Sequence, residues 1–75
     1  MKRRWIVKTY EWVSGSVQYQ PFSRAFRSEW EARKLFNSLR LTLNLISKEL
    51  IYDSSEDLIT VEQWDLTSKG VVRAV

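Results

Sequence analysis

Residues 28–46, SEWEARKLFNSLRLTLNLI, constrain the fold more than any other stretch, because they combine a helix start with sustained helical periodicity. Ser28 and Glu31 form a capping box, in which each side chain accepts a hydrogen bond from the other residue's backbone N–H. Glu29 and Glu31 also place negative charge at the positive end of the helix dipole. Apolar residues at spacings of three and four then line one face: Ala32, Leu35, Phe36, Leu39, Leu43 and Ile46.

The end of this helix is ambiguous, because leucine alternates with polar residues from Leu39 to Leu45. A period of two is typical of a half-buried strand. The helix therefore either covers about 29–46, which we prefer, or stops near Leu39 and gives way to the next strand. At about 100° per residue, the longer helix brings a second sector together on its outer side: Trp30, Lys34, Leu41 and Leu45.

Strand-like segments flank the helix on both sides. Residues 4–13 and 17–26 are rich in aromatic and β-branched side chains and are separated by a Ser-Gly-Ser turn, which predicts a hairpin. Pro21 cannot donate to a ladder, so we expect an edge strand or a bulge there. Residues 48–53 and 58–66 predict a second hairpin, and the 70–75 segment is either a tail or an extra edge strand. The predicted fold class is α+β, a two-layer ββαββ sandwich whose antiparallel sheet is covered by one helix.

The first predicted strand is apolar on both faces. Because successive side chains point to opposite sides of a strand, one face carries Trp5, Val7 and Thr9, and the other carries Ile6, Tyr10 and Trp12. We therefore expect both faces of the sheet to be covered.

The composition limits the chemistry available to the chain. The 75 residues suit a single domain, 1–75, with a thin stability margin, since so short a chain buries only about 60% of its unfolded surface. There is no cysteine and no histidine, which removes disulfides, most transition-metal sites and the usual general base near neutral pH. The carboxylates of residues 53–57 lack calcium-loop spacing and suit a solvated hairpin tip. We predict no enzymatic activity, no catalytic residue, no metal and no cofactor.

The sequence also bears on location. No apolar run approaches the ~18 residues of a membrane span, and the start MKRRWIVK lacks the apolar core of a signal peptide. We expect no membrane partner and a cytoplasmic location, which suits a chain without cysteine.

Charge is divided unevenly along the chain. Residues 1–40 hold nine Lys/Arg against three Glu, and residues 41–75 hold three Lys/Arg against six Asp/Glu, which together give the net charge of +3. This asymmetry indicates an acidic partner for the first half or pairing between subunits. Rings interleave with cations in the first two predicted strands, which suits either a hydrophobic sheet face with a basic rim or a surface that stacks on bases beside phosphates. The rings are Trp5, Tyr10, Trp12, Tyr19 and Phe22. The candidate nucleic-acid residues are Arg3, Arg4, Trp5, Lys8, Arg24 and Arg33.

Two resemblances bear on function. An aromatic strand and a hairpin, followed by Phe26, Ser28, Glu31 and Ala32 at a helix start, resemble the arm-type DNA-binding domain of phage integrases over about half of the chain. That resemblance implies DNA binding, although this chain has two predicted strands before the helix and that domain has three. A short, cysteine-free chain without a chemical motif is also similar in character to the small proteins with which phages block host machinery, anti-CRISPR proteins among them. Neither resemblance assigns the chain to a family.

The predicted function is that of a small non-catalytic protein-interaction module of viral or mobile-element type. It would form a homodimer or dock through its outer helix face, as an inhibitor of a host protein complex does. Contiguous apolar surface usually marks an interface, which assigns partner binding to Trp30, Lys34, Leu41 and Leu45, with Lys34 contributing its methylene stem. The alternative is a nucleic-acid-binding module that uses the basic first half. Basic residues clustered on one face would favour the alternative, and their mixing with the carboxylates of residues 49–65 would favour a protein partner.

Overall fold

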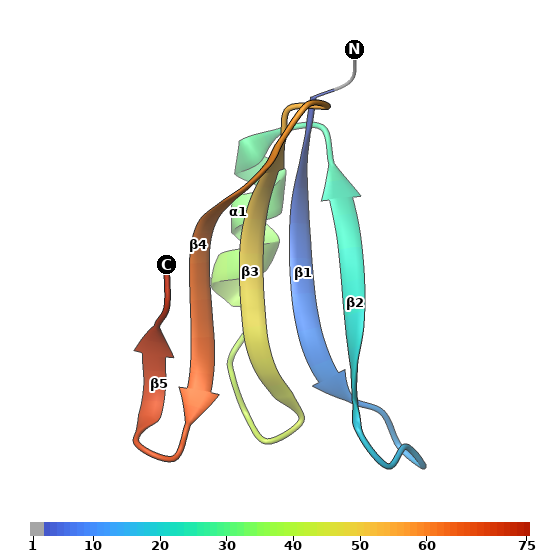
Figure 1. The fold of residues 1–75 in the computed structure, drawn as a ribbon, viewed down its shortest axis with the longest axis vertical. Coiled ribbons are helices and arrows are strands. Elements are labelled where there is room, and N and C mark those ends of the chain that lie inside the picture. Colours follow the sequence, from blue (N-terminus) through green and yellow to red (C-terminus); the bar gives the residue numbers. More distant parts are fainter. Residues whose placement is uncertain (1–2) are drawn as a thin grey trace.

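The computed structural model describes residues 3–75 and has the predicted two-layer α+β architecture (Figure 1). Two strands, β1 (Arg4–Trp12) and β2 (Tyr19–Phe26), precede the helix α1 (Glu29–Ser38). Three strands follow it: β3 (Leu45–Asp53), β4 (Leu58–Thr67) and β5 (Gly70–Arg73). Neighbouring strands pair antiparallel in the order β2-β1-β3-β4-β5. The segment after Lys69 is thus an additional edge strand.

The hairpins follow the turn residues of the sequence. Gly15 has a φ of 84°, a left-handed conformation that glycine adopts without a Cβ penalty, in the turn between β1 and β2. The β1–β2 register is continuous, so Pro21 lies in an edge strand without a bulge. In the β3–β4 pair the register shifts so that Leu50 lies opposite Glu62 while Ile51 lies opposite Thr60. This places a bulge at Val61 in β4, between the paired residues Thr60 and Glu62.

The helix begins where its cap predicts. Ser28 has an extended backbone (φ −118°, ψ 145°), and its Oγ accepts a hydrogen bond of 3.2 Å from the Glu31 N–H. The reciprocal hydrogen bond to the Glu31 carboxylate is not formed among residues 3–75. Ala32 and Phe36, one turn apart, are fully buried against the sheet.

The predicted end of the helix near residue 46 is wrong, because α1 ends at Ser38. Leu39 has an extended backbone (φ −79°, ψ 127°), and its N–H bonds back to the carbonyls of Leu35 and Phe36. The cation at this helix end comes from β3: the Lys48 ammonium donates to the carbonyls of Phe36 and Leu39 at 2.7 and 2.9 Å. Positive charge here also complements the helix dipole.

Residues 40–44 form a loop that leads into β3. Thr42 and Leu45 exchange backbone hydrogen bonds of 2.9 and 3.1 Å across a tight turn, and the Thr42 hydroxyl accepts from the Asn44 N–H. The Asn44 carbonyl accepts from the N–H of Trp12 in β1 at 2.7 Å. Threonine and asparagine compete with helical hydrogen bonds in this way. The alternating leucines therefore lie in the loop that leads into β3 and at the start of that strand, and not in the helix.

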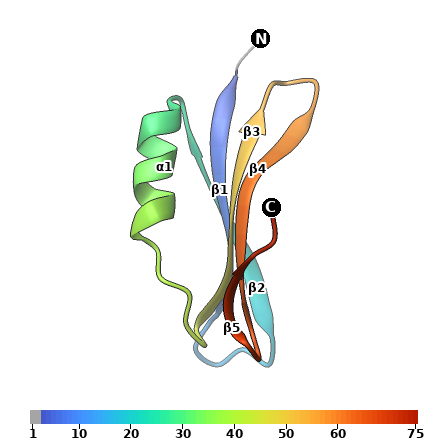
Figure 2. The same cartoon turned by 90° about the vertical axis from the view of Figure 1, so that its left-hand side faces the viewer.

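The hydrophobic core lies between α1 and one face of the sheet. Its centre consists of Val7, Ala32, Phe36 and Leu50, and α1 packs on β1, β2 and β3. Figure 2 shows the helix on one side of the sheet, while no element of residues 3–75 lies over the other side. The expectation that both faces are covered is therefore wrong for this chain on its own. We call the uncovered side the open face.

Candidate functional site

The four residues predicted to bind a partner do not form one surface. Trp30 and Lys34 lie together on α1, where Trp30 is 69% exposed and the Lys34 ammonium lies 5.1 Å from the centre of the indole ring. Leu41 lies in the loop after the helix, and Leu45 opens β3 and lines a crevice between α1 and the sheet. Because α1 ends at Ser38, the predicted second apolar sector of the helix is wrong.

Two concave features lie beside α1. Trp30, Arg33, Lys34 and Asn37 line an open hollow of about 370 Å³, in which the indole is the single aromatic group. The crevice on the sheet side has a volume of about 90 Å³ and is lined by Val7, Thr9, Glu11, Phe22, Arg24, Leu35, Leu39 and Leu45. This crevice is smaller than the ~150 Å³ cavity that accepts a benzene-sized guest. It is better explained as a gap in packing than as a ligand site.

Two of the basic residues predicted to contact nucleic acid pair with carboxylates. The Arg4 guanidinium donates to Asp53 at 2.9 Å, and its hydrogen bond lowers the pKa of that carboxyl. Arg33 donates to Glu62 at 3.1 Å and to Glu29 at 3.2 Å. Both Asp53 and Glu62 belong to the acidic 49–65 region, so Arg4 and Arg33 are mixed with carboxylates and are not part of a basic cluster.

The other candidates for nucleic-acid contact are divided between the faces. Trp5 lies on the helix side and packs on Tyr52, with 4.7 Å between ring centres. Arg24 lies on the same side at the crevice, whereas Lys8 lies on the open face. Arg3 precedes β1 and is exposed. These residues therefore do not build one continuous basic surface.

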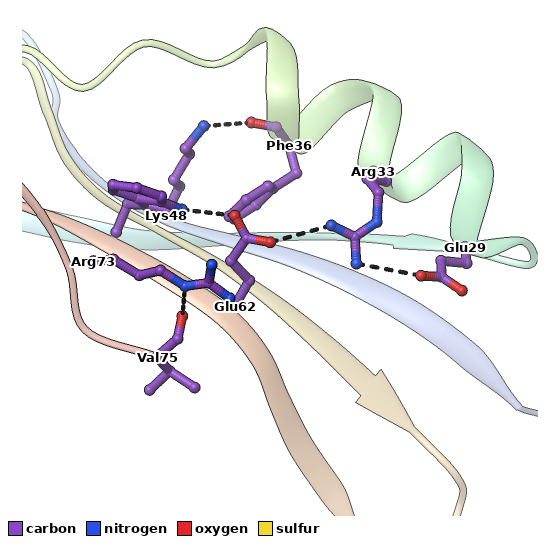
Figure 3. Close-up of polar contacts among 8 residues, drawn as sticks. Glu29, Arg33, Phe36, Lys48, Glu62, Arg73 and Val75 are labelled. Carbon is purple, nitrogen blue, oxygen red and sulfur yellow. Dashed lines mark hydrogen bonds and ion pairs between the residues drawn. The ribbon is translucent and has the colours of Figure 1, made fainter.

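Glu62 joins the helix to the sheet (Figure 3). Its carboxylate accepts from Arg33 on α1 at 3.1 Å and from the Trp64 indole N–H at 2.7 Å. The Arg73 guanidinium lies 6.0 Å from the centre of the Trp64 ring. The hydrogen bond from Trp64 lowers the pKa of Glu62, desolvation opposes this, and Arg33 and Arg73 lower the pKa further.

Lys48 lies beside this network and closes the end of α1. Its ammonium lies 4.4 Å from the centre of the Phe36 ring, in addition to the two carbonyls it contacts. Burial lowers the pKa of Lys48, and the charge of Glu62 opposes that shift. Within residues 3–75, every buried side-chain polar atom has a hydrogen-bond partner. We therefore assign Lys48 and Glu62 a structural role.

Neither a metal-ligand cluster nor a membrane-spanning helix is found among residues 3–75. Within the described residues, no three or more Asp or Glu side chains are placed to hold a metal ion. Over the same range, no helix is long and apolar enough to cross a membrane.

The open face carries an aromatic cluster, formed by the rings of Tyr10, Trp12 and Tyr19 with Pro21 beside them. The register places Tyr10 opposite Pro21 and Trp12 opposite Tyr19, on the side away from the core residue Val7. Tyr10 and Trp12 are 43% and 40% exposed. The Tyr19 ring stacks on Tyr10 at 6.1 Å and meets Trp12 edge-on at 5.1 Å. The three rings thus support one another as a continuous patch.

The other half of the open face is polar and lies on β3 and β4. Asp65 accepts from the Ser47 hydroxyl at 2.9 Å and from the Gln63 amide at 3.1 Å. Glu49 accepts from the Thr60 hydroxyl. Neither carboxylate is among the ion pairs formed within residues 3–75. Two carboxylates held by hydrogen bonds, with no ion pair within 4 Å, therefore lie next to the aromatic cluster.

A hollow of about 320 Å³ lies where the two halves meet, lined by Lys8, Thr9, Tyr10, Pro21, Ser47 and Glu49. Lys8 and Glu49 are cross-strand neighbours in the β1–β3 register. The position of Tyr10 on this face could be predicted from the alternation of side chains in β1. The position of Glu49 beside it depends on the pairing of β1 with β3, which the sequence did not specify. Comparison with family models, curated proteins and solved structures finds no match to this chain.

Proposed function

We propose that this chain is a non-catalytic module that binds a protein partner through the open face of its sheet. The proposal is carried by the aromatic cluster, in which Tyr10, Trp12 and Pro21 are exposed and Tyr19 is half-buried, on a face that no element of residues 3–75 covers. Aromatic residues are enriched at protein interfaces, and tryptophan and tyrosine are frequent anchors there. A contiguous exposed apolar patch on a small protein typically marks an interaction site.

The dimensions of the open face support this function. Across its two longer axes the molecule measures 38 by 26 Å, and Figure 1 views the sheet along the shortest axis. A stable protein interface buries about 800 Å² on each partner, which is comparable to the area of this face. One partner can therefore bury the aromatic cluster and the neighbouring carboxylates together. Occupying a partner's surface needs no catalytic group, so an inhibitor of a host protein complex is one form of this function.

A nucleic acid is the second candidate, because Lys8 lies beside Tyr10 on the same face. Exposed rings stack on bases, and cations neutralise phosphates. The carboxylates of Glu49 and Asp65 would repel those phosphates from the other half of the face. The charge of the open face therefore favours the protein partner.

Photo-crosslinking from two matched aromatic positions tests the proposal. A benzophenone amino acid replaces Tyr10 on the open face in one variant and Trp30 on the helix in the other, within the intact chain in the cells that produce it. We expect position 10 to crosslink to a discrete protein, competed by unmodified chain, and position 30 not to do so. Crosslinks to that protein from position 30 alone would overturn the assignment to the open face. Crosslinks from position 10 to nucleic acid would replace the protein partner with the second candidate.

A further inference from the structure

We propose that the hollow on the open face recognises an arginine side chain of the partner protein. This inference rests on the proposed function and specifies the chemistry of the partner at the same site. Three strands contribute to the hollow: Lys8 and Tyr10 come from β1, Pro21 from β2, and Ser47 and Glu49 from β3. The hollow therefore combines an aromatic wall, an apolar ring and a carboxylate within about 320 Å³.

The residues that line the hollow suit an arginine side chain, which has a guanidinium group at the end of an apolar stem. Tyr10 is 43% exposed and offers a ring on which a planar cation stacks. The Glu49 carboxylate can accept the paired N–H groups of arginine, and the Thr60 hydroxyl holds one of its oxygens in place before a ligand arrives. Pro21 supplies apolar surface for the methylene stem.

The local charge favours a cationic ligand. Arg4 and Asp53 pair with each other on the open face, which leaves Lys8 against Glu49 and Asp65. The open face thus carries one excess negative charge, although the chain as a whole carries +3. A cation that binds here does so against the net charge of the molecule, so non-specific attraction does not explain its binding.

Lys8 separates this proposal from a nucleic-acid site. It lies directly across from Glu49 in the β1–β3 register and competes with an incoming guanidinium for that carboxylate. Removing the Lys8 charge therefore strengthens arginine binding. At a phosphate-binding site the same change would weaken binding, because a neutralising cation is lost.

An NMR titration of the intact chain tests the proposal with a small probe, N-acetyl-L-arginine methylamide. We expect saturable chemical-shift changes confined to the neighbourhood of Tyr10, Ser47 and Glu49. The citrulline analogue, which keeps the shape without the charge, should give none. The lysine analogue should bind more weakly, because an ammonium lacks the planar paired donors.

Three variants complete the test. Glu49→Gln should weaken the arginine probe about tenfold, the usual effect of losing a charge-assisted hydrogen bond. Lys8→Gln should strengthen it severalfold, and Glu56→Gln, at the exposed hairpin tip, should leave it unchanged. Unchanged signals of the core residue Phe36 establish that each variant is folded.

Absence of saturable shifts, equal binding of the citrulline probe, or weakening by Lys8→Gln would each overturn the arginine site. Those results leave the proposed function standing if position 10 still crosslinks to a protein. If the probe binds as expected while position 10 crosslinks to no protein, the proposed function fails and the hollow is a cation site without that role.

Discussion

Replacing Glu62 with glutamine tests whether its contact between α1 and β4 stabilises the fold. The carboxylate accepts from Arg33 at 3.1 Å and Trp64 at 2.7 Å, and 18% of the Glu62 side chain is exposed against 34% for Arg33. A hydrogen bond to a charged group contributes about 1.5–3 kcal/mol, and an exposed ion pair contributes less than about 1 kcal/mol. Because Glu62→Gln keeps the shape and one acceptor oxygen, we expect the free energy of unfolding to fall by about 1.5 kcal/mol. With a urea slope of about 1 kcal/mol per molar, the midpoint of tryptophan-detected unfolding falls by about 1.5 M.

The same variant has a defined pH dependence. In the folded state the pKa of Glu62 lies below its ordinary value of 4.5, so the folded state binds fewer protons than the unfolded state in the interval between these pKa values. The stabilisation by Glu62 is therefore complete above the ordinary pKa and is lost as the pH falls through the folded-state pKa. Glutamine does not titrate. The difference in stability between the two proteins should be full near pH 7 and should shrink as the pH falls below 4.5 and through the folded-state pKa of Glu62.

Glu56→Gln is the matched control, because it removes the same charge at an exposed hairpin tip. We expect it to change the free energy of unfolding by less than about 0.5 kcal/mol. A loss for Glu62→Gln no larger than that of the control would refute the reasoning. So would a loss that persists undiminished in acid, because it would not depend on the carboxylate charge.

Three further substitutions test the helix and its predicted outer surface by urea unfolding. Ser28→Ala removes the acceptor of the Glu31 N–H and should cost about 1 kcal/mol. Lys48→Met keeps an apolar stem but leaves the terminal helix carbonyls without their ammonium donor, and should cost about 1–2 kcal/mol. Trp30→Ala should change the free energy of unfolding by less than about 0.5 kcal/mol, because the indole is largely exposed, and a larger loss would mean that it packs on the fold.

The start of the helix could be predicted from the sequence because the interactions that create it are local. Ser28 and the N–H it caps are three residues apart, and the buried positions Ala32 and Phe36 are one helical turn apart. The strands were predictable for the same reason, since alternation and turn residues act within a few positions. The resulting ββαββ order holds for the described chain, with β5 as an additional edge strand.

The end of the helix could not be predicted, because distant residues determine it. From Leu39 to Leu45 the sequence satisfies both a helical and a strand period. The ammonium of Lys48 binds the last helix carbonyls from β3, and the N–H of Trp12 in β1 bonds the carbonyl of Asn44. Both partners become neighbours of the loop only after the sheet has formed. Local periodicity therefore carried no information that could decide between the two interpretations.

The open face could have been inferred from the number of helices and the size of the sheet. Ten helical residues span about 15 Å, whereas the molecule measures 38 by 26 Å in the plane of the sheet. One short helix cannot cover two faces, so the alternation of Ile6, Tyr10 and Trp12 with Trp5 and Val7 leaves one apolar set without cover from the described chain. That set must lie against solvent or against another molecule. Tyr10, Trp12 and Tyr19 contact one another there, whereas Trp30 is the single aromatic group of its hollow, and this contiguity is the physical reason to propose a partner on the open face rather than on the helix.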